Sequence, residues 1–221
     1  LTVDLGNSGV LNVNVDSDGD TASAALTAGQ LDAGSMVIDG GDDNDDTATF
    51  SGTITTDTAG LAISDFTIVD LDGDVTTATT LSISDVATRV DLAAGVDLRS
   101  TGNLSVGTNV ASILLSGADT TANVVDATGD ASTVTLAAVA ATNNDVDLTV
   151  NSDGNISLTS VNLGTTGTLT INLDDDNDTA DSNLTAGALA GGTVSIDGGD
   201  GNDDVTINGA LTSNTAGISI T

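Results

Sequence analysis

The chain has 221 residues, of which 33 are acidic and two are basic, and its formal charge is −31. Every acidic residue is Asp, the two cations are Arg89 and Arg99, and His, Cys, Pro, Trp and Tyr are absent. These absences exclude a basic face for nucleic acid, disulfides and a thiolate, imidazole or amine nucleophile. We therefore expect a protein that is not an enzyme, binds no nucleic acid and inserts into no membrane.

The composition nevertheless favours a folded chain over a disordered one. Hydrophobic residues make up 38% of the chain and the mean hydropathy is +0.18. Val, Ile, Leu and Thr recur in alternating runs, which predicts half-buried strands. Self-repulsion among so many carboxylates disfavours a compact state. Because the chain has almost no cations of its own, we expect bound cations to offset that repulsion.

In chain order, the sequence predicts short strands separated by Gly-, Asn- and Asp-rich turns at intervals of roughly ten residues. Two Ala-rich segments, 22–30 and 181–190, also fit short helices or tight solenoid corners. The predicted strands lie at residues 1–5, 11–15, 36–39, 61–64, 66–71, 81–84, 89–92, 112–116, 133–136, 146–150, 156–161, 168–173, 193–197 and 218–221.

Many short strands suit either a β-solenoid or a string of β-sandwich domains. The sandwich is less favoured, because Phe50 and Phe66 are the only aromatic residues for its cores. The absence of Pro suits a continuous ladder in which each strand donates hydrogen bonds on both sides. We therefore predict an all-β, parallel β-solenoid (β-helix) with rungs of roughly 20–25 residues at about 4.8 Å each.

An internal repeat organises the chain. Residues 9–46 align without gaps onto residues 167–204 at an offset of 158, with 22 identities in 38 positions. After a one-residue gap the match resumes at an offset of 157. We expect residues 1–8 to end a preceding module, 9–166 to form one module and 167–221 to begin the next, so that the chain is a segment of a longer tandem array.

Each copy of the repeat contains an acidic, Gly-rich turn, GGDDNDD at residues 40–46 and GGDGNDD at residues 198–204. Glycines allow the backbone to turn with positive φ, and converging carboxylates and carbonyls are the ligands that Ca²⁺ prefers. In the first copy, Asp43 replaces the third glycine and Thr47 replaces the apolar residue Val205. The alternative to a calcium site is a solvated turn that holds no ion.

A second acidic motif, D-x-D-x-D, lies upstream of each Gly-rich turn and once more between the copies. Its spacing directs three side chains toward one centre, as in the first half of an EF-hand loop, but the chain has no Glu to complete an EF-hand. The alternative is an exposed acidic turn. The copies lie at residues 16–20, 70–74 and 174–178, with a weaker form at 151–155.

Two further features leave alternatives open. N-x-[ST] sequons, the acceptor sites of N-glycosylation, occur at Asn103, Asn155, Asn177 and Asn183; the alternative is that they are chance matches in an Asn- and Thr-rich chain. Arg89 and Arg99 fit either salt bridges to neighbouring aspartates or pairing with the acidic edge of another copy.

Residues 198–206, GGDGNDDVT, match the nonapeptide GGxGxDxUx of the RTX repeat at every defined position. The chain thus resembles calcium-binding RTX-type bacterial surface-layer proteins, and by composition also large secreted adhesins built from β-strand repeats. The resemblance implies that Asp203 would bind calcium with Gly198, Asp200 and nearby carbonyls, and that Val205 would face the core.

From the residues and the resemblance together we expect a calcium-stabilised structural repeat of an extracellular filament or surface layer, whose partners are copies of itself. The alternative is the stalk of a cell-surface adhesin, for which surface glycans would be partners. An ice-binding solenoid is a more distant alternative, because Thr-x-Thr occurs only sporadically. The candidate Ca²⁺ ligands are Asp197, Gly198, Asp200, Asp203 and Asp204; Asp39, Gly40, Asp42, Asp45 and Asp46; and Asp16, Asp18, Asp20, Asp174, Asp176, Asp178, Asp70, Asp72 and Asp74.

Overall fold

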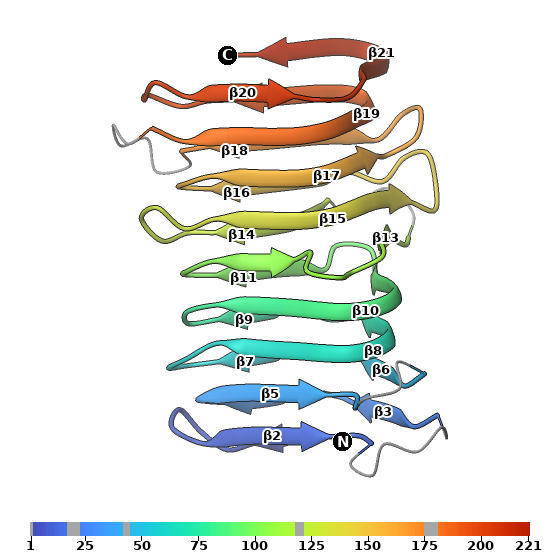
Figure 1. Cartoon of the computed structure of the whole chain (residues 1–221), viewed down its shortest axis with the longest axis vertical. Helices are drawn as coiled ribbons and strands as arrows, with labels where there is room; N and C mark the ends of the chain where they lie inside the picture. The colour runs from blue at the N-terminus through green and yellow to red at the C-terminus, as the bar shows by residue number, and fades with distance from the viewer. Residues whose placement is uncertain (1, 17–22, 42–44, 118–121, 175–180) are drawn as a thin grey trace.

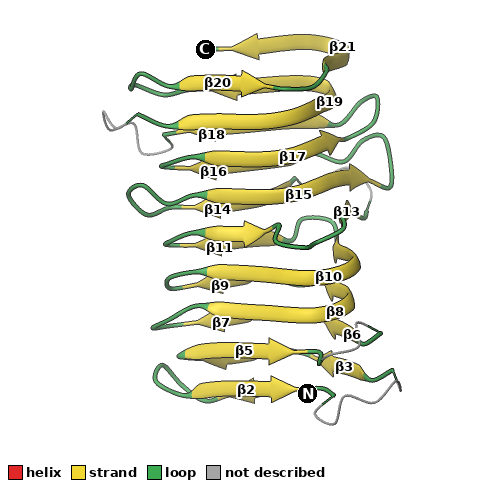
Figure 2. Ribbon diagram, viewed as in Figure 1, coloured by secondary structure: helices red, strands yellow, loops and turns green. Residues whose placement is uncertain are grey.

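The computed structural model describes residues 2–16, 23–41, 45–117, 122–174 and 181–221 as a parallel β-solenoid (Figure 1). Every strand pairing is parallel, and the described residues contain no helix (Figure 2). The fold class predicted from the sequence is confirmed. The strands are β1 (Val3–Asp4), β2 (Val10–Asn14), β3 (Ala25–Ala28), β4 (Leu31–Ala33), β5 (Ser35–Asp39), β6 (Thr47–Phe50), β7 (Ile54–Thr56), β8 (Leu61–Leu71), β9 (Val75–Thr77), β10 (Leu81–Leu92), β11 (Asp97–Ser100), β12 (Leu104–Val106), β13 (Ile113–Leu115), β14 (Asn123–Ala127), β15 (Val134–Ala141), β16 (Leu148–Ser152), β17 (Ile156–Asn162), β18 (Thr168–Leu173), β19 (Asn183–Asp197), β20 (Asp204–Ile207) and β21 (Leu211–Ile220).

The strand pairings define three faces, which the chain visits in the order A, B, C on every turn. Face A consists of β1, β4, β7, β9, β11, β14, β16, β18, residues 193–197 of β19 and residues 217–220 of β21. Face B consists of β2, β5, the first parts of β8 and β10, β12, the first parts of β15, β17 and β19, and β20. Face C consists of β3, β6, the later parts of β8 and β10, β13, the later parts of β15 and β17, residues 188–191 of β19, and the start of β21.

The core is a set of aliphatic ladders, because alternate residues of each strand point inward and stack on their counterparts in the next turn. Phe50 and Phe66 are both fully buried, so the two aromatic residues fill the interior. One ladder on face B has members that are each at most 2% exposed: Met36, Leu61, Leu81, Leu104, Val134, Ile156 and Leu184.

The helical alternative for the two Ala-rich segments is wrong. Residues 25–28 form β3 and residues 183–190 belong to β19. Each segment is a rung in an existing ladder, paired in parallel with the next turn. That pairing outweighs the helix propensity of alanine, which is a weak preference. No helix in the described ranges is long and apolar enough to cross a membrane.

The sequence repeat is out of phase with the solenoid. β2 lies on face B, whereas its counterpart 158 residues later, β18, lies on face A. In the same way β5 lies on face B and its counterpart at the end of β19 lies on face A. One copy of the repeat therefore spans a whole number of turns less one face. Equivalent segments of the two copies thus lie on neighbouring faces of the three-sided solenoid.

The outward side chains differ sharply between faces. On face B, the central outward column contains no ionisable residue, whereas the corresponding column on face A contains both charged and uncharged polar residues. The face B column is Asn12, Val37, Ala62, Ser82, Ser105, Thr135, Ser157, Thr185 and Thr206. The face A column is Asp4, Asp32, Thr55, Thr76, Arg99, Asp126, Asn151, Asn172 and Asp197.

Candidate metal centres at two acidic corners

The two acidic motifs of the first copy meet at one corner of the solenoid, which we call the lower corner. β2 and β5 pair on adjacent turns of face B, and an acidic turn follows each of them. Asp16 therefore lies against Gly41 of the next turn. Gly41 has φ +110°, and a Cβ there would lie 2.6 Å from the Asp16 carbonyl oxygen. Only glycine fits this close approach.

The carboxylates of the lower corner are only partly satisfied by the protein. Asp16 is 9% exposed and its buried Oδ2 has no hydrogen-bond partner. A buried oxygen of Asp45, Oδ1, also has none. Asp39 Oδ1 accepts a bond of 3.0 Å from Gly41 N, and Asp46 Oδ1 accepts one from Ala24 N on the adjacent turn. Unpaired buried carboxylate oxygens are costly unless a cation neutralises them, so these oxygens suit a hard divalent cation.

The second copy forms a corresponding upper corner, between faces A and B. β18 and the end of β19 pair on adjacent turns, so Asp174 lies against Gly199. Asp174 is 2% exposed, and its Oδ2 accepts a bond of 3.1 Å from Asp200 N. Asp203 Oδ1 accepts a bond of 2.7 Å from Ser182 N. The carboxylates here join one turn of the solenoid to the next.

The GGDGND turn borders a hollow at the upper corner. The hollow has a volume of about 370 Å³ and is lined by Gly198, Gly199, Gly201, Asp203, Val205, Ile220 and Thr221. Val205 is partly buried and packs against the core, as the RTX resemblance implied.

The two Gly-rich turns differ in length by one residue. Between β5 and β6 the chain has seven residues, 40–46, whereas between β19 and β20 it has six, 198–203. The gap in the sequence alignment therefore lies inside this turn. As a result Ala48, not Thr47, takes the inward place of Val205, and the expectation that Thr47 replaces the apolar residue is wrong. Asp46 takes the place of Asp203, because Ala24 N and Ser182 N, 158 residues apart, donate to these two carboxylates.

Among the described residues, no three carboxylates gather closely enough to hold a metal ion by themselves. The third D-x-D-x-D loop illustrates this. Asp70 faces outward on face C beside Asp91, while Asp74 Oδ1 accepts a bond of 3.0 Å from Asp97 N on the next turn. Burial, Asp72 and Asp91 raise the pKa of Asp70, and Arg89 opposes them. Five predicted ligands lie outside the described residues: Asp18, Asp20, Asp42, Asp176 and Asp178.

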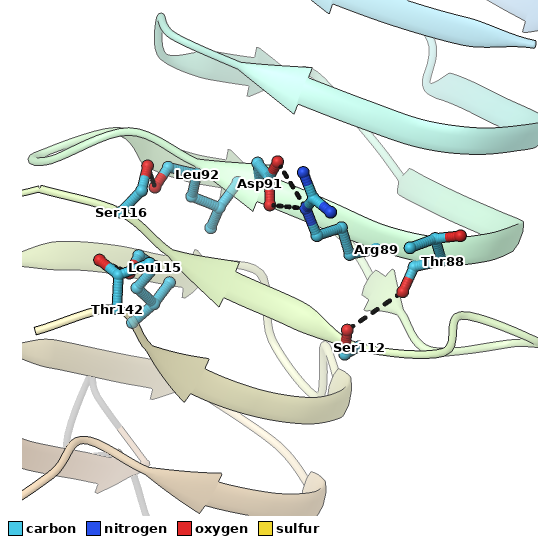
Figure 3. A network of polar contacts seen from close by, with 8 residues as sticks. All are labelled: Thr88, Arg89, Asp91, Leu92, Ser112, Leu115, Ser116 and Thr142. Atoms are coloured by element: carbon cyan, nitrogen blue, oxygen red, sulfur yellow. Dashed lines mark hydrogen bonds and ion pairs between the residues drawn. The ribbon is translucent and has the colours of Figure 1, made fainter.

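Both arginines pair with aspartates of this same chain. Arg89 Nε lies 2.8 Å from Asp91 Oδ1 (Figure 3). Arg99 bridges Asp97 at 2.9 Å and Asp126, on the next turn, at 2.8 Å. The hydrogen bond to Asp97, and the charges of Asp97 and Asp126, raise the pKa of Arg99 against the effect of burial. Around Arg89, Ser112 and Ser116 donate to backbone carbonyls of the adjacent turn (Figure 3).

Sequence reasoning missed an acidic group on face A. Asp4 and Asp32 are partners in adjacent strands, and Asp57 is close to Asp32. Desolvation and the charges of Asp57 and Asp4 raise the pKa of Asp32. These residues are 25 to 28 positions apart in the sequence, so only the register of the ladder could have identified the group.

The geometry can supply oxygen ligands and hold two turns together. Comparison of the chain with protein-family models, with curated proteins and with solved structures finds no match.

Proposed function

We propose that the chain is a non-enzymatic, calcium-stabilised structural repeat of an extracellular, self-assembling filament or surface layer. The observation that carries the proposal is the stacking of two acidic turns on adjacent rungs in both copies. In each copy a buried carboxylate, Asp16 or Asp174, lies directly against a glycine of the next turn. A divalent cation at such a corner would neutralise carboxylates and tie successive rungs together.

The charge of the whole chain supports the same role. With 33 aspartates and two arginines, the fold has few internal counter-charges, and the two arginines already serve three aspartates. Oxygen ligands from carboxylates and glycine-turn carbonyls favour calcium over softer metals. Extracellular fluid is where such a weak-to-moderate calcium site would be permanently loaded.

The test is thermal unfolding of the chain followed by circular dichroism, in millimolar CaCl₂, in MgCl₂ and in EDTA. Each occupied site at one hundred times its Kd adds about 2.7 kcal/mol to the free energy of unfolding. We therefore expect a higher Tm in calcium than in EDTA and a smaller increase in magnesium, which demands stricter octahedral geometry. Equal Tm values in all three buffers would refute the calcium role. Electron microscopy of the same samples would test assembly into fibres or sheets.

A further inference from the structure

We infer that face B is a self-association surface, on which a second copy of this chain packs face to face. The inference deepens the self-assembly part of the proposed function and is independent of the calcium part. It rests on the contrast between the net charge of −31 and the absence of ionisable side chains from the central column of face B.

The uncharged surface is wider than that column. The outward column where each strand enters face B carries a charge only at Asp204, and the column where each strand leaves carries one only at Asp39. Asp65 and Asp85 follow directly, at the corner between faces B and C, and mark the edge of the uncharged surface. Between Asp204 and Asp39 the surface carries Ser, Thr, Asn and Ala side chains, glycines, and the valines Val10 and Val37. Small side chains on a parallel sheet leave a flat surface, onto which another sheet can pack at about 10 Å.

Face B also carries exposed valines in β2 and β5. Val10 is 61% exposed and Val37 is 47% exposed. Val37 pairs in register with Ala62, which continues into the hydroxyl-bearing column at Ser82. Large exposed apolar side chains that border an uncharged surface are a feature of protein interfaces.

The charge of the molecule indicates which partner can bind face B. A cationic partner would be drawn to the acidic corners or to face A, where Asp32, Asp126 and Asp197 lie in the central column. Another copy of the chain is repelled wherever carboxylates would meet, since like charges brought together across an interface cost several kcal/mol. Face B against face B brings uncharged surfaces together, so it is the arrangement that two such acidic molecules tolerate.

The size of face B sets the expected strength. With rungs about 4.8 Å apart and about five residues across, the surface measures about 40 Å by 15 Å, or about 600 Å² per copy. A pair would bury about 1,200 Å² in total, which is at the lower limit for a specific interface. We therefore expect a weak dimer, with a Kd of about 0.1–1 mM, that strengthens as salt screens the repulsion between the two molecules.

The experiment is sedimentation velocity of the calcium-loaded chain, at low and at high NaCl concentration, with two matched double variants. Ser157→Asp/Thr185→Asp adds two charges to adjacent rungs of face B, where Ser157 and Thr185 are partners in register. Thr149→Asp/Thr170→Asp adds two charges to adjacent rungs of face A, also in register. The face B pair should raise the Kd at least tenfold, and the face A pair should change it less than threefold.

Circular dichroism of each variant checks the fold. Should the aspartate pair unfold the chain, Ser157→Gln/Thr185→Gln disturbs the flat surface without adding charge and should also weaken association. A sedimenting monomer at about 1 mM protein in high salt, or equal weakening by the face A and face B pairs, would overturn the proposal. Dimer formation that persists in EDTA, with an unchanged Tm, would instead count against the calcium role alone.

Discussion

The lower and upper acidic corners arise from the same stretch of repeated sequence, but the protein satisfies their carboxylates to different degrees. In the upper corner, Asp174 Oδ2 and Asp203 Oδ1 both accept backbone hydrogen bonds. In the lower corner, Asp16 Oδ2 and Asp45 Oδ1 accept none. The extra residue in the lower turn moves Asp46 into the place of Asp203 and leaves Asp45 as an additional carboxylate.

The two turns differ in length by one residue and also in acidic content, with four aspartates at residues 40–46 and two at residues 198–203. The six-residue turn leaves its carboxylates bonded to adjacent backbone, so the upper corner can stay ordered with or without an ion. The seven-residue turn buries acidic oxygens that the protein does not pair. We therefore expect the lower corner to depend more strongly on calcium.

The largest effect should come from adding a methyl group to the two turn glycines. A Cβ at Gly41 would lie 2.6 Å from the backbone oxygen of Asp16, whereas at Gly199 it would lie 2.7 Å from the carboxylate oxygen of Asp174. Backbone cannot move aside as a side chain can. Gly41→Ala should therefore lower the free energy of unfolding by about 3 kcal/mol and Gly199→Ala by about 1–2 kcal/mol, measured by chemical denaturation.

Gly217→Ala is the control for backbone strain alone. Gly217 has φ +120° and a Cβ there would have no neighbour within 4 Å. A loss of stability in Gly41→Ala no greater than in Gly217→Ala would show that contact with Asp16 does not matter.

The second-largest effect should come from neutralising two buried aspartates, Asp16 and Asp174. In EDTA, the two substitutions should change the free energy of unfolding in opposite directions. Asp16→Asn removes a charge whose Oδ2 has no protein partner, so in EDTA it should stabilise the chain by about 1–2 kcal/mol and in calcium destabilise it. Asp174→Asn weakens the bond from Asp200 N and should destabilise by about 1 kcal/mol in both buffers. Thermal melts of both variants in both buffers test this; the same sign for Asp16→Asn in calcium and EDTA would contradict it.

A third, smaller effect should follow from exchanging the turns. Replacing residues 40–46 by GGDGND makes the lower turn six residues long and keeps Ala48 facing the core. We expect stability in EDTA to rise by about 1 kcal/mol, because the turn loses two aspartates and with them the unpaired carboxylate oxygen of Asp45. The calcium-dependent rise in Tm should shrink toward that of the upper corner. A variant that loses its β-sheet signal would show that the seventh residue is required by the fold.

The smallest effect concerns a site where the two copies differ, since Asp32 corresponds to Ala190 in the second copy. The pKa of Asp32 is raised in the folded chain by desolvation and by Asp57 and Asp4. A raised folded pKa means that the charged form is disfavoured, so its cost is present above that pKa and is relieved as pH falls toward 3.8. Asp32→Asn should therefore stabilise the chain slightly at pH 7, and the gain should vanish near pH 4 in paired melts.

The sequence predicted the longer, Val-, Ile- and Leu-rich strands because their signal is local, but it predicted no segment at β3, β4, β6, β7, β9, β11, β12 or β14. Alternating Val, Ile and Leu can be recognised from neighbouring residues alone. TLTINL forms β18 at its predicted bounds, whereas LAIS and FTIVDL, predicted as two strands, are joined in β8. The absence of Pro and the scarcity of aromatic residues favoured a solenoid over a string of sandwich domains. The core agrees with this, because it consists of aliphatic ladders in which Phe50 and Phe66 are buried. The pairing of the two acidic motifs was also visible, since their spacing is close to one turn.

Properties that depend on register could not be predicted. Turns of the solenoid vary in length, so residues as far apart as Ser105 and Thr135 are neighbours on face B while Thr149 and Thr170 are neighbours on face A. A shift of one residue changes which side chains point outward. The uncharged face, the acidic group at Asp32 and the exchange of Asp45 for Asp46 all follow from such shifts. The Ala-rich segments were ambiguous for the same reason, because only the adjacent rung decides between helix and strand.

The rotation between the two copies has a consequence for how two molecules can meet. The lower corner lies where strands leave face B and the upper corner lies where they enter it; in Figure 1, β6 lies to the right of β5, and the turn before β20 lies to the left. The two acidic corners thus lie at opposite ends of one diagonal of face B. When two such faces are opposed, in parallel or antiparallel orientation, each acidic end of the diagonal meets a neutral end of the other. The diagonal placement of the two acidic corners follows from a repeat that falls one face short of a whole number of turns, and it leaves both orientations open.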